Sequence, residues 1–376
     1  MSPLSSIAYT TSLVPVLLLG ACTSSLSSPP PPDAAPPDSL AAPEAGGDGG
    51  LESSVHAPIT ESVVPCSAQP TAVTTGVGQF TGGGGSLAYE HDGGVWVLPA
   101  TSSVATEIMP DETPASFSVD DEFLLVVEGA TNQTLLSVNL ATGAQWALTQ
   151  SYWIYGALCA HYAFWWATTS GESWTLNVSP ADGSVKSTAL ATQSSDSELV
   201  CDGTSMSWTD DSNRVWTMPV GGSPTGGVTL APDAAWTAQS STLYFAQMGM
   251  QGADDFTPFT IVTEPLAGGA ITTLATSLPP NYPSPAGSPG NGPTSIVPGP
   301  KRVFWAEWWG EGGVGPTGSL INWQLRAVAP AGGTPATIEA FTYGPDSATT
   351  GTAPELARDG VAVYWTSEGT LMRLCE

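Results

Sequence analysis

Positively charged side chains are scarce in this sequence. Its 376 residues include 7 Lys and Arg against 34 Asp and Glu, which gives a formal net charge of −27. A nucleic-acid-binding protein replaces phosphate counterions with its own cations, and this chain has few to offer. We therefore expect no nucleic-acid partner. Long helices are also disfavoured, because Lys, Arg and Glu are among the best helix formers.

The sequence also has few residues suited to metal binding or nucleophilic catalysis. It contains 3 His and no Cys-x-x-Cys pair, so we expect neither a metal site nor a cofactor. No Gly-x-Ser-x-Gly segment accompanies a His, which argues against a Ser-His-Asp hydrolase. No residue is therefore predicted to be catalytic.

No apolar run is long enough to cross a bilayer as a helix. Residues 13–21 are apolar and lead directly into Cys22, and a run of this length suits the core of a signal peptide. Residues 19–22 (Leu-Gly-Ala-Cys) resemble the bacterial lipobox, whose cysteine receives diacylglycerol. The resemblance implies a signal peptide at residues 1–21, a lipid on Cys22 and attachment to a membrane through it. Residues 1–12 depart from the usual pattern because they contain no Lys or Arg.

The next segment predicts a spacer rather than a folded domain. Residues 22–65 are rich in Pro, Ala, Gly and Ser and have few large apolar side chains, so they cannot form a core and are expected to be disordered. Residues 66–376 are expected to form a single domain. Apart from Cys22 the sequence has four cysteines, and in a chain that is expected to be exported this even number favours two disulfides: Cys66, Cys159, Cys201 and Cys375.

The strongest signal is an internal repeat. Residues 200–209 (Val-Cys-Asp-Gly-Thr-Ser-Met-Ser-Trp-Thr) align without gaps with residues 357–366 (Ala-Arg-Asp-Gly-Val-Ala-Val-Tyr-Trp-Thr). The same frame applied along the chain gives seven anchor positions, with intervals of 38, 39, 42, 37, 60 and 60 residues: Tyr89, Val127, Trp166, Trp208, Phe245, Trp305 and Trp365.

Each anchor ends a short apolar run and is followed by a polar turn, a second run, a Gly-rich or polar turn and a third run. With the strand before the Asp-Gly turn, the unit has four antiparallel strands in about forty residues, the size of a propeller blade. We therefore predict an all-β fold, a seven-bladed β-propeller with four-stranded antiparallel blades. Such sheets cannot bury both faces alone, but a closed ring covers every face.

Ring closure gives a specific prediction. The seventh unit ends at Glu376, after its third strand, so residues 72–75 (Ala-Val-Thr-Thr) are expected to supply its outer strand. That arrangement brings Cys66 and Cys375 together as one disulfide. Cys159 and Cys201 occupy equivalent positions in successive units and are expected to form the other.

The repeat resembles the degenerate bacterial propeller repeats of the NHL, YVTN and TolB-like kind. The resemblance covers residues 66–376 and is strongest at 199–231 and 356–375, where Met-Ser-Trp-Thr and Val-Tyr-Trp-Thr carry it. It implies a binding or scaffolding platform more often than an enzyme.

Ligand or partner contacts are expected at Trp153, Trp308 and Trp309, because these tryptophans stand in loop-like surroundings and exposed aromatics bind sugars or proteins. The two long intervals contain Gly- and Pro-rich insertions at 279–300 and 308–319, where binding residues tend to lie.

We therefore expect a monomeric, non-catalytic, lipid-anchored envelope protein that faces the periplasm or the medium and binds another envelope protein or a glycan. It would serve as a binding module or, docked through its rim, as part of an envelope complex. The alternative is a polysaccharide-active enzyme, a glycoside hydrolase or lyase, with carboxylates in the central channel. The available acidic residues are Asp120, Asp121, Glu122, Asp210, Asp211, Asp254, Asp255 and Glu307. Most of them occupy turn-like segments, where Asp is favoured for backbone reasons.

Overall fold

The computed structural model describes residues 59–110, 113–232, 234–249, 258–277, 291–311, 320–343 and 354–376. The chain divides into two units, Met1–Val55 and His56–Glu376. The predicted signal peptide, Cys22 and most of the predicted linker lie outside the described residues. Within the described ranges, no helix has the length and apolar character needed to cross a bilayer.

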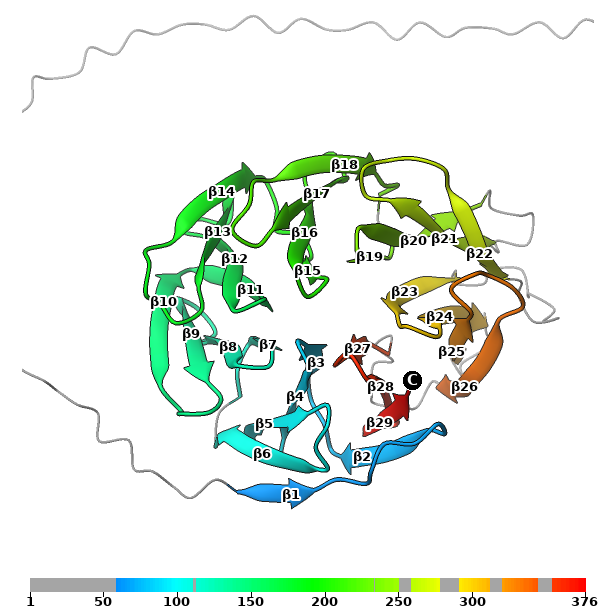
Figure 1. Cartoon of the computed structure of the whole chain (residues 1–376), viewed down its shortest axis with the longest axis horizontal. Helices are drawn as coiled ribbons and strands as arrows, with labels where there is room; N and C mark the ends of the chain where they lie inside the picture. Colours follow the sequence, from blue (N-terminus) through cyan, green and yellow to red (C-terminus); the bar gives the residue numbers. More distant parts are fainter. Residues whose placement is uncertain are drawn as a thin grey trace, which may run out of the picture. The chain divides into compact units, whose positions relative to one another are not determined.

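The second unit is an all-β, seven-bladed propeller, as the repeat predicts. Its 29 described strands form seven antiparallel sheets arranged around a central axis (Figure 1). Blades two to six each consist of four consecutive strands, with the first strand nearest the axis. They are, in order, β7 (Ser116–Val119), β8 (Phe123–Glu128), β9 (Gln133–Asn139) and β10 (Gln145–Ser151); β11 (Trp153–Cys159), β12 (Tyr162–Thr168), β13 (Trp174–Pro180) and β14 (Thr188–Gln193); β15 (Val200–Cys201), β16 (Ser205–Thr209), β17 (Arg214–Pro219) and β18 (Thr225–Thr229); β19 (Trp236–Gln239), β20 (Thr242–Met248), β21 (Phe259–Pro265) and β22 (Thr272–Ser277); β23 (Asn291–Pro298), β24 (Val303–Glu311), β25 (Leu320–Val328) and β26 (Ala336–Tyr343).

Blade seven joins the two ends of the second unit and closes the ring. Its inner strands are β27 (Leu356–Arg358), β28 (Ala362–Ser367) and β29 (Thr370–Cys375), and its outermost strand is β2 (Thr71–Thr75), which pairs with β29. The predicted outer strand is thus confirmed.

Blade one carries an additional strand. Next to β3 (Phe80–Gly83), β4 (Ser86–His91), β5 (Gly94–Pro99) and β6 (Val104–Met109), the short β1 (Thr60–Ser62) pairs with β6. Val63, which follows β1, is buried in the core. The folded part therefore starts before Cys66, within the segment that the composition alone suggests is a spacer.

All seven predicted anchors lie in the second strand of a blade and are buried: Tyr89, Val127, Trp166, Trp208, Phe245, Trp305 and Trp365. Successive strand residues face opposite sides of a sheet, so one blade serves two interfaces. Trp165 packs in the apolar cluster between blades two and three, and Trp166 packs in the cluster between blades three and four. Each of the seven apolar clusters combines residues from two adjacent blades. Burial of a large apolar side chain contributes about 2–3 kcal/mol, so stability depends mainly on the contacts between blades.

The recurring Asp-Gly pairs form the turns that follow the innermost strands. Gly203 and Gly360 have φ angles of +93° and +98°, which favour glycine. Asp202 Oδ1 accepts the backbone N–H of Ser205, and Asp359 Oδ1 accepts that of Ala362. The motif is therefore explained by backbone geometry.

The predicted insertions contain more strand than expected. Residues 291–298 form β23, and residues 308–311 extend β24, which pairs along its length with β25. The expectation of loop surroundings for Trp308 and Trp309 is therefore wrong. Regular pairing with β25 outweighs the turn tendency of the Gly residues that follow. Residues 279–290 and 312–319 lie outside the described residues.

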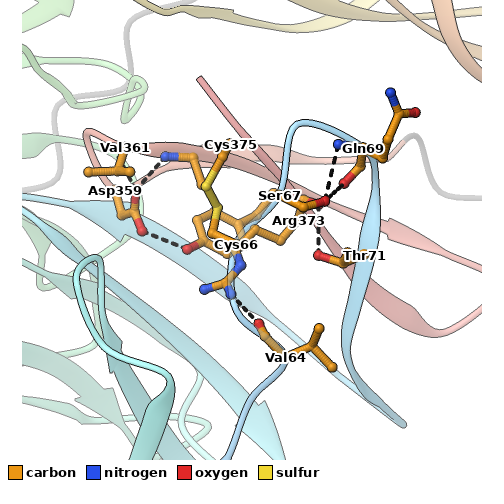
Figure 2. Close-up of a disulfide and its surroundings, with 11 residues drawn as sticks. Val64, Cys66, Ser67, Gln69, Thr71, Asp359, Val361, Arg373 and Cys375 are labelled. Carbon is orange, nitrogen blue, oxygen red and sulfur yellow. Dashed lines mark hydrogen bonds between the residues drawn. A yellow bond between two sulfur atoms is a disulfide. The ribbon is translucent and has the colours of Figure 1, made fainter.

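Both predicted disulfides are present. Cys66 and Cys375 are joined with a Cα–Cα distance of 5.6 Å, and Cys159 and Cys201 with one of 5.4 Å. Figure 2 shows the first disulfide where the N-terminal segment meets the last blade. Each is a long-range crosslink, with a sequence separation of 309 for the first and 42 for the second.

Candidate functional site

The candidate site is the central channel of the propeller. A cavity of about 750 Å³ is lined by residues from all seven innermost strands or their ends. Because the blades repeat around the axis, the innermost strands all begin at one end of the channel and turn at the other. We call these ends the Glu mouth, where Glu198 and Glu355 precede β15 and β27, and the Asp mouth, where the Asp202 and Asp359 turns lie.

Two glutamates converge at the Glu mouth. Glu198 precedes β15 in blade four and Glu355 precedes β27 in blade seven, three blades further round the ring (Figure 1). Enclosure by the channel wall raises the pKa of Glu198 to about 7, and the negative charge of Glu355 adds to the rise. Enclosure also raises the pKa of Glu355. Both side chains remain accessible to water within the channel, which moderates these effects.

Tyr155 of β11 completes this group. It lines the same cavity, and burial followed by the charges of Glu198, Asp196 and Glu355 raises the pKa of its hydroxyl to about 12. The Glu mouth therefore presents two coupled carboxyl groups beside a neutral phenol.

The Asp mouth has a different character. The guanidinium of Arg358 donates a hydrogen bond to Gly360 O and, with the Gln239 amide oriented to satisfy its neighbours, a second to Gln239. Gln239 then donates to Pro298 O, so these contacts link blades five, six and seven. A Cβ at Gly82 would lie 2.6 Å from the carbonyl oxygen of Arg358, so only glycine permits this approach of blade one to blade seven.

The acidic residues identified in the sequence have structural partners elsewhere. Asp120 accepts backbone N–H groups from Phe123 and from His161 in the next blade. Asp210 accepts hydrogen bonds from the backbone of Ser212 and Arg214 and from the indole of Trp216. Asp211 accepts the backbone N–H and hydroxyl of Ser194. Asp254 and Asp255 lie outside the described residues.

Glu307 is also engaged. It is 3% exposed, forms an ion pair with Arg326 at 3.2 Å and accepts the indole N–H of Trp305 at 2.8 Å. These contacts satisfy a buried carboxylate within the blade, and Glu307 does not line the channel cavity.

Asp120, Asp121 and His161 offer three oxygen or nitrogen atoms within 4.8 Å of one another. Both Asp120 oxygens already accept backbone N–H groups, and Asp121 is exposed. The group fits a turn stabilised by Asp120 better than a metal site.

The predicted contact tryptophans differ in their surroundings. Trp153 is the first residue of β11, two residues before Tyr155, and is 40% exposed. Its ring meets that of Tyr152, also 40% exposed, edge-to-face at 5.5 Å. Trp308 lies partly buried in β24 with its ring 6.3 Å from that of Trp323. The backbone of Trp309 pairs with Asn322, and its side chain lies outside the described set.

Sequence reasoning missed Glu198, Glu355 and Tyr155, although a signal for the glutamates was available. The alignment of blades four and seven extends toward the N-terminus, where residues 197–203 read Ser-Glu-Leu-Val-Cys-Asp-Gly and residues 354–360 read Pro-Glu-Leu-Ala-Arg-Asp-Gly. The same Glu-Leu pair thus lies at the start of the innermost strand in both blades, directly before β15 and with Leu356 as the first residue of β27. Residues at equivalent positions of two blades lie at the same level of the channel.

Comparison with protein-family models gives no match, and no curated protein matches either. Among solved structures, BamB from Moraxella catarrhalis matches with 12% identity and a TM-score of 0.44, over 85% of this chain and 100% of that one. TolB from Acinetobacter baumannii matches with 13% identity and a TM-score of 0.39, over 64% and 61%. The β-propeller domain of the Trilobed protease from Pyrococcus furiosus matches with 8% identity and a TM-score of 0.45, over 68% and 79%. At these values the similarities carry no argument about function, and the fold assignment rests on the strand pairing.

Proposed function

We propose that this chain is an extracytoplasmic, lipid-anchored envelope protein whose monomeric propeller binds a protein or a glycan at the Glu mouth, without catalysing a reaction. The observation that carries this proposal is the exposed aromatic pair Tyr152 and Trp153, at the start of the innermost strand β11. Large exposed aromatics on a rigid scaffold are typical of contact residues, because they bury much apolar area at a small cost in conformational entropy.

The two disulfides support the proposed location, since such bonds persist in oxidising compartments. The proposed anchor is the lipid on Cys22, in the segment that resembles a lipobox. Metabolic labelling with a fatty-acid analogue tests it: wild-type chain should carry the label in a membrane fraction, and Cys22→Ala should carry none.

Binding is tested with purified full chain as bait against envelope extract and on a glycan array. We expect a specific protein or glycan that wild-type chain retains and Trp153→Ala loses. Ile271→Ala is a matched control, because Ile271 is 50% exposed in the turn between β21 and β22. Equal retention by both variants would contradict the Glu mouth as the binding surface.

A second candidate is a polysaccharide-active enzyme, and the glutamate pair favours it. A carboxyl group with a pKa near 7 beside a second carboxyl is an arrangement that general acid–base catalysis uses. Incubation with a panel of polysaccharides distinguishes the two proposals. Turnover by the wild type that Glu198→Gln and Glu355→Gln both abolish, with Glu172→Gln unaffected, would establish the enzyme and overturn the non-catalytic proposal.

A further inference from the structure

Tyr152 and Trp153 form an aromatic corner at the Glu-mouth end of β11. Their rings meet edge-to-face, with centroids 5.5 Å apart and planes inclined at 80°, and each residue is 40% exposed. Two rings at this angle make the walls of a corner rather than one flat patch. Such a corner can hold a small rigid ring against one aromatic face while the second ring limits its sideways movement.

The backbone that carries this corner is fixed by contacts from two blades. Trp153 is paired with Thr168 in β12, and the hydroxyl of Ser151 donates a hydrogen bond to the backbone carbonyl of Thr168 at 2.7 Å. The backbone N–H of Ile154 donates to the side-chain carbonyl of Gln133, a residue of blade two that is 3% exposed. The rings are thus exposed on a backbone that is already ordered before a ligand binds, which lowers the entropic cost of binding.

The corner is an isolated apolar feature. Two aromatic side chains exposed to this extent present roughly 200 Å² of surface, whereas each partner in a stable protein interface buries about 800 Å². The other exposed large apolar side chains of the described ranges lie in the N-terminal segment, in blades one, five and seven or, for Val185, at the opposite end of blade three. The apolar area therefore matches one or two sugar rings better than the surface of a protein.

The charges around the corner disfavour an acidic ligand. The sequence has no Lys or Arg before Lys186, which stands in the loop between β13 and β14, about 20 Å from Trp153 along the strands of blade three. Arg214 of blade four lies over the ring of Trp216. A uronic acid or a sulfated sugar would therefore meet a chain with a net charge of −27, without a cation to pair with at this end of blade three.

A neutral pyranose ring has the chemistry that suits this surface. CH groups cover one face of the ring and pack on an aromatic face through dispersion, and the hydroxyl groups around its edge accept and donate hydrogen bonds. Exposed, uncharged polar residues flank the corner along the chain and at the end of β12: Gln150, Thr169 and Ser170. We propose that the Tyr152–Trp153 corner binds one or two pyranose rings of a neutral glycan, with a sugar ring stacked on Trp153. This inference rests on the proposed binding function and names the class of its ligand.

The test is calorimetric titration of full chain with cellohexaose, laminarihexaose, chitohexaose and maltohexaose, and with oligogalacturonate as the anionic counterpart. We expect at least one neutral oligosaccharide to bind and oligogalacturonate not to bind. Trp153→Ala should weaken binding about thirtyfold, whereas Trp153→Tyr, which keeps an aromatic ring, should weaken it less. Ile271→Ala is the matched control, since it removes an exposed apolar side chain in blade five. Affinity should be unchanged between about 0.05 M and about 0.5 M NaCl, because stacking on a neutral sugar involves no charge pair.

Binding of any of the neutral oligosaccharides that Trp153→Ala loses and Ile271→Ala retains would support the proposal. It would be overturned by the absence of binding across the neutral set, by equal binding of oligogalacturonate, by unchanged affinity in Trp153→Ala or by a loss of affinity at high salt. If the oligosaccharides fail to bind while the bait experiment still yields a protein lost in Trp153→Ala, the corner is a protein contact, so the glycan inference is wrong and the binding function stands. If both experiments fail, the proposed function fails with it.

Discussion

The guanidinium of Arg373, in β29, donates a hydrogen bond to the backbone carbonyl of Val64, 309 residues earlier in the chain (Figure 2). Arg373 is 1% exposed and also hydrogen-bonds to Tyr364, whose hydroxyl donates to Asp359 at 2.6 Å. The first described residues are thus attached to the last blade by β2, by a disulfide and by this buried polar chain.

Replacement of Arg373 by Met should destabilise the propeller by about 1–3 kcal/mol, because it removes the donor to Val64 and leaves the Tyr364–Asp359 pair without its positive neighbour. Urea denaturation of the purified chain measures the change. Lys186→Met is the control, since Lys186 is exposed. Equal stability of the two variants would show that Arg373 contributes nothing to closure.

The two disulfides should contribute unequally. The stabilisation that a crosslink gives by restricting the unfolded chain increases with the length of the loop it closes, and the separations are 309 for Cys66–Cys375 and 42 for Cys159–Cys201. We expect Cys66→Ser/Cys375→Ser to lose about 2 kcal/mol more than Cys159→Ser/Cys201→Ser. Denaturation under oxidising conditions measures the difference, and reduction of wild-type chain should reproduce the sum. The reverse ranking would contradict the prediction.

The ring and its closure follow from the sequence because the repeat is local and strongly patterned. The segments that end at Trp208-Thr209 and Trp365-Thr366 share an Asp-Gly pair at the same spacing, and that frame locates all seven second strands. The strand β1 has no such signal, since Thr60–Ser62 is three residues long and its strand partner is β6, which lies more than forty residues later in the chain. Trp308 was assigned to a loop because Gly and Pro residues surround it, whereas pairing with β25 makes it part of a strand.

The candidate site was only partly predictable. The sequence identifies Trp153 only as an aromatic residue in an expected loop, whereas the structure places it at the first position of β11 with 40% of its side chain exposed. Its role as a contact residue stays a prediction. The convergence of Glu198 and Glu355 depends on which positions of an innermost strand face the axis and on the number of blades between them. The sequence shows the two Glu-Leu pairs, but it does not show that both glutamates face the same channel. The carboxylates of Asp120 and Asp210 are more conspicuous in the sequence because they stand in turns. In the structure, both accept hydrogen bonds from backbone N–H groups.

Glu198 should reduce stability at alkaline pH. Its pKa is about 7 in the folded protein and near 4.5 when unfolded, so the folded protein retains a proton that the unfolded chain releases between these values. Stability therefore falls as the pH rises from about 4.5 to 7. Glu198→Gln, which does not titrate, should gain relative to wild type over this window, by about 1 kcal/mol or less because water reaches the group.

The midpoint of thermal unfolding, followed from about pH 4 to about pH 9, tests this. The wild type and Glu198→Gln should coincide at the acidic end, separate between about pH 4.5 and 7, and differ by a constant amount above neutrality. Glu172→Gln should follow the wild type throughout. A constant offset between Glu198→Gln and the wild type at every pH would mean that the substitution acts by some route other than ionisation.

Ionisation of Asp210 should have the opposite effect on how stability changes with pH. Burial alone would raise its pKa, but hydrogen bonds from Ser212, Trp216 and Arg214 outweigh that effect and lower it to about 2. The ionised form therefore stabilises the fold above about pH 4, and this contribution disappears as the pH falls toward 2. Asp210→Ala should lose about 1–2 kcal/mol at neutral pH and little at the acidic limit. Urea denaturation at neutral pH and at the acidic limit, with Glu172→Ala as control, checks the prediction.

Trp153 should matter for binding and not for stability. Its side chain is 40% exposed and contacts the equally exposed ring of Tyr152, so truncation leaves no cavity in the core. Trp153→Ala should weaken partner or glycan binding by about 2 kcal/mol, roughly thirtyfold, while the thermal midpoint shifts by no more than about 1 °C. Trp166→Ala provides the contrast, because Trp166 is fully buried between blades and its loss should cost about 3–5 kcal/mol of stability. If Trp153→Ala instead lowers the thermal midpoint as Trp166→Ala does and leaves binding intact, the exposed aromatic pair is a packing feature and the binding surface lies on another part of the propeller.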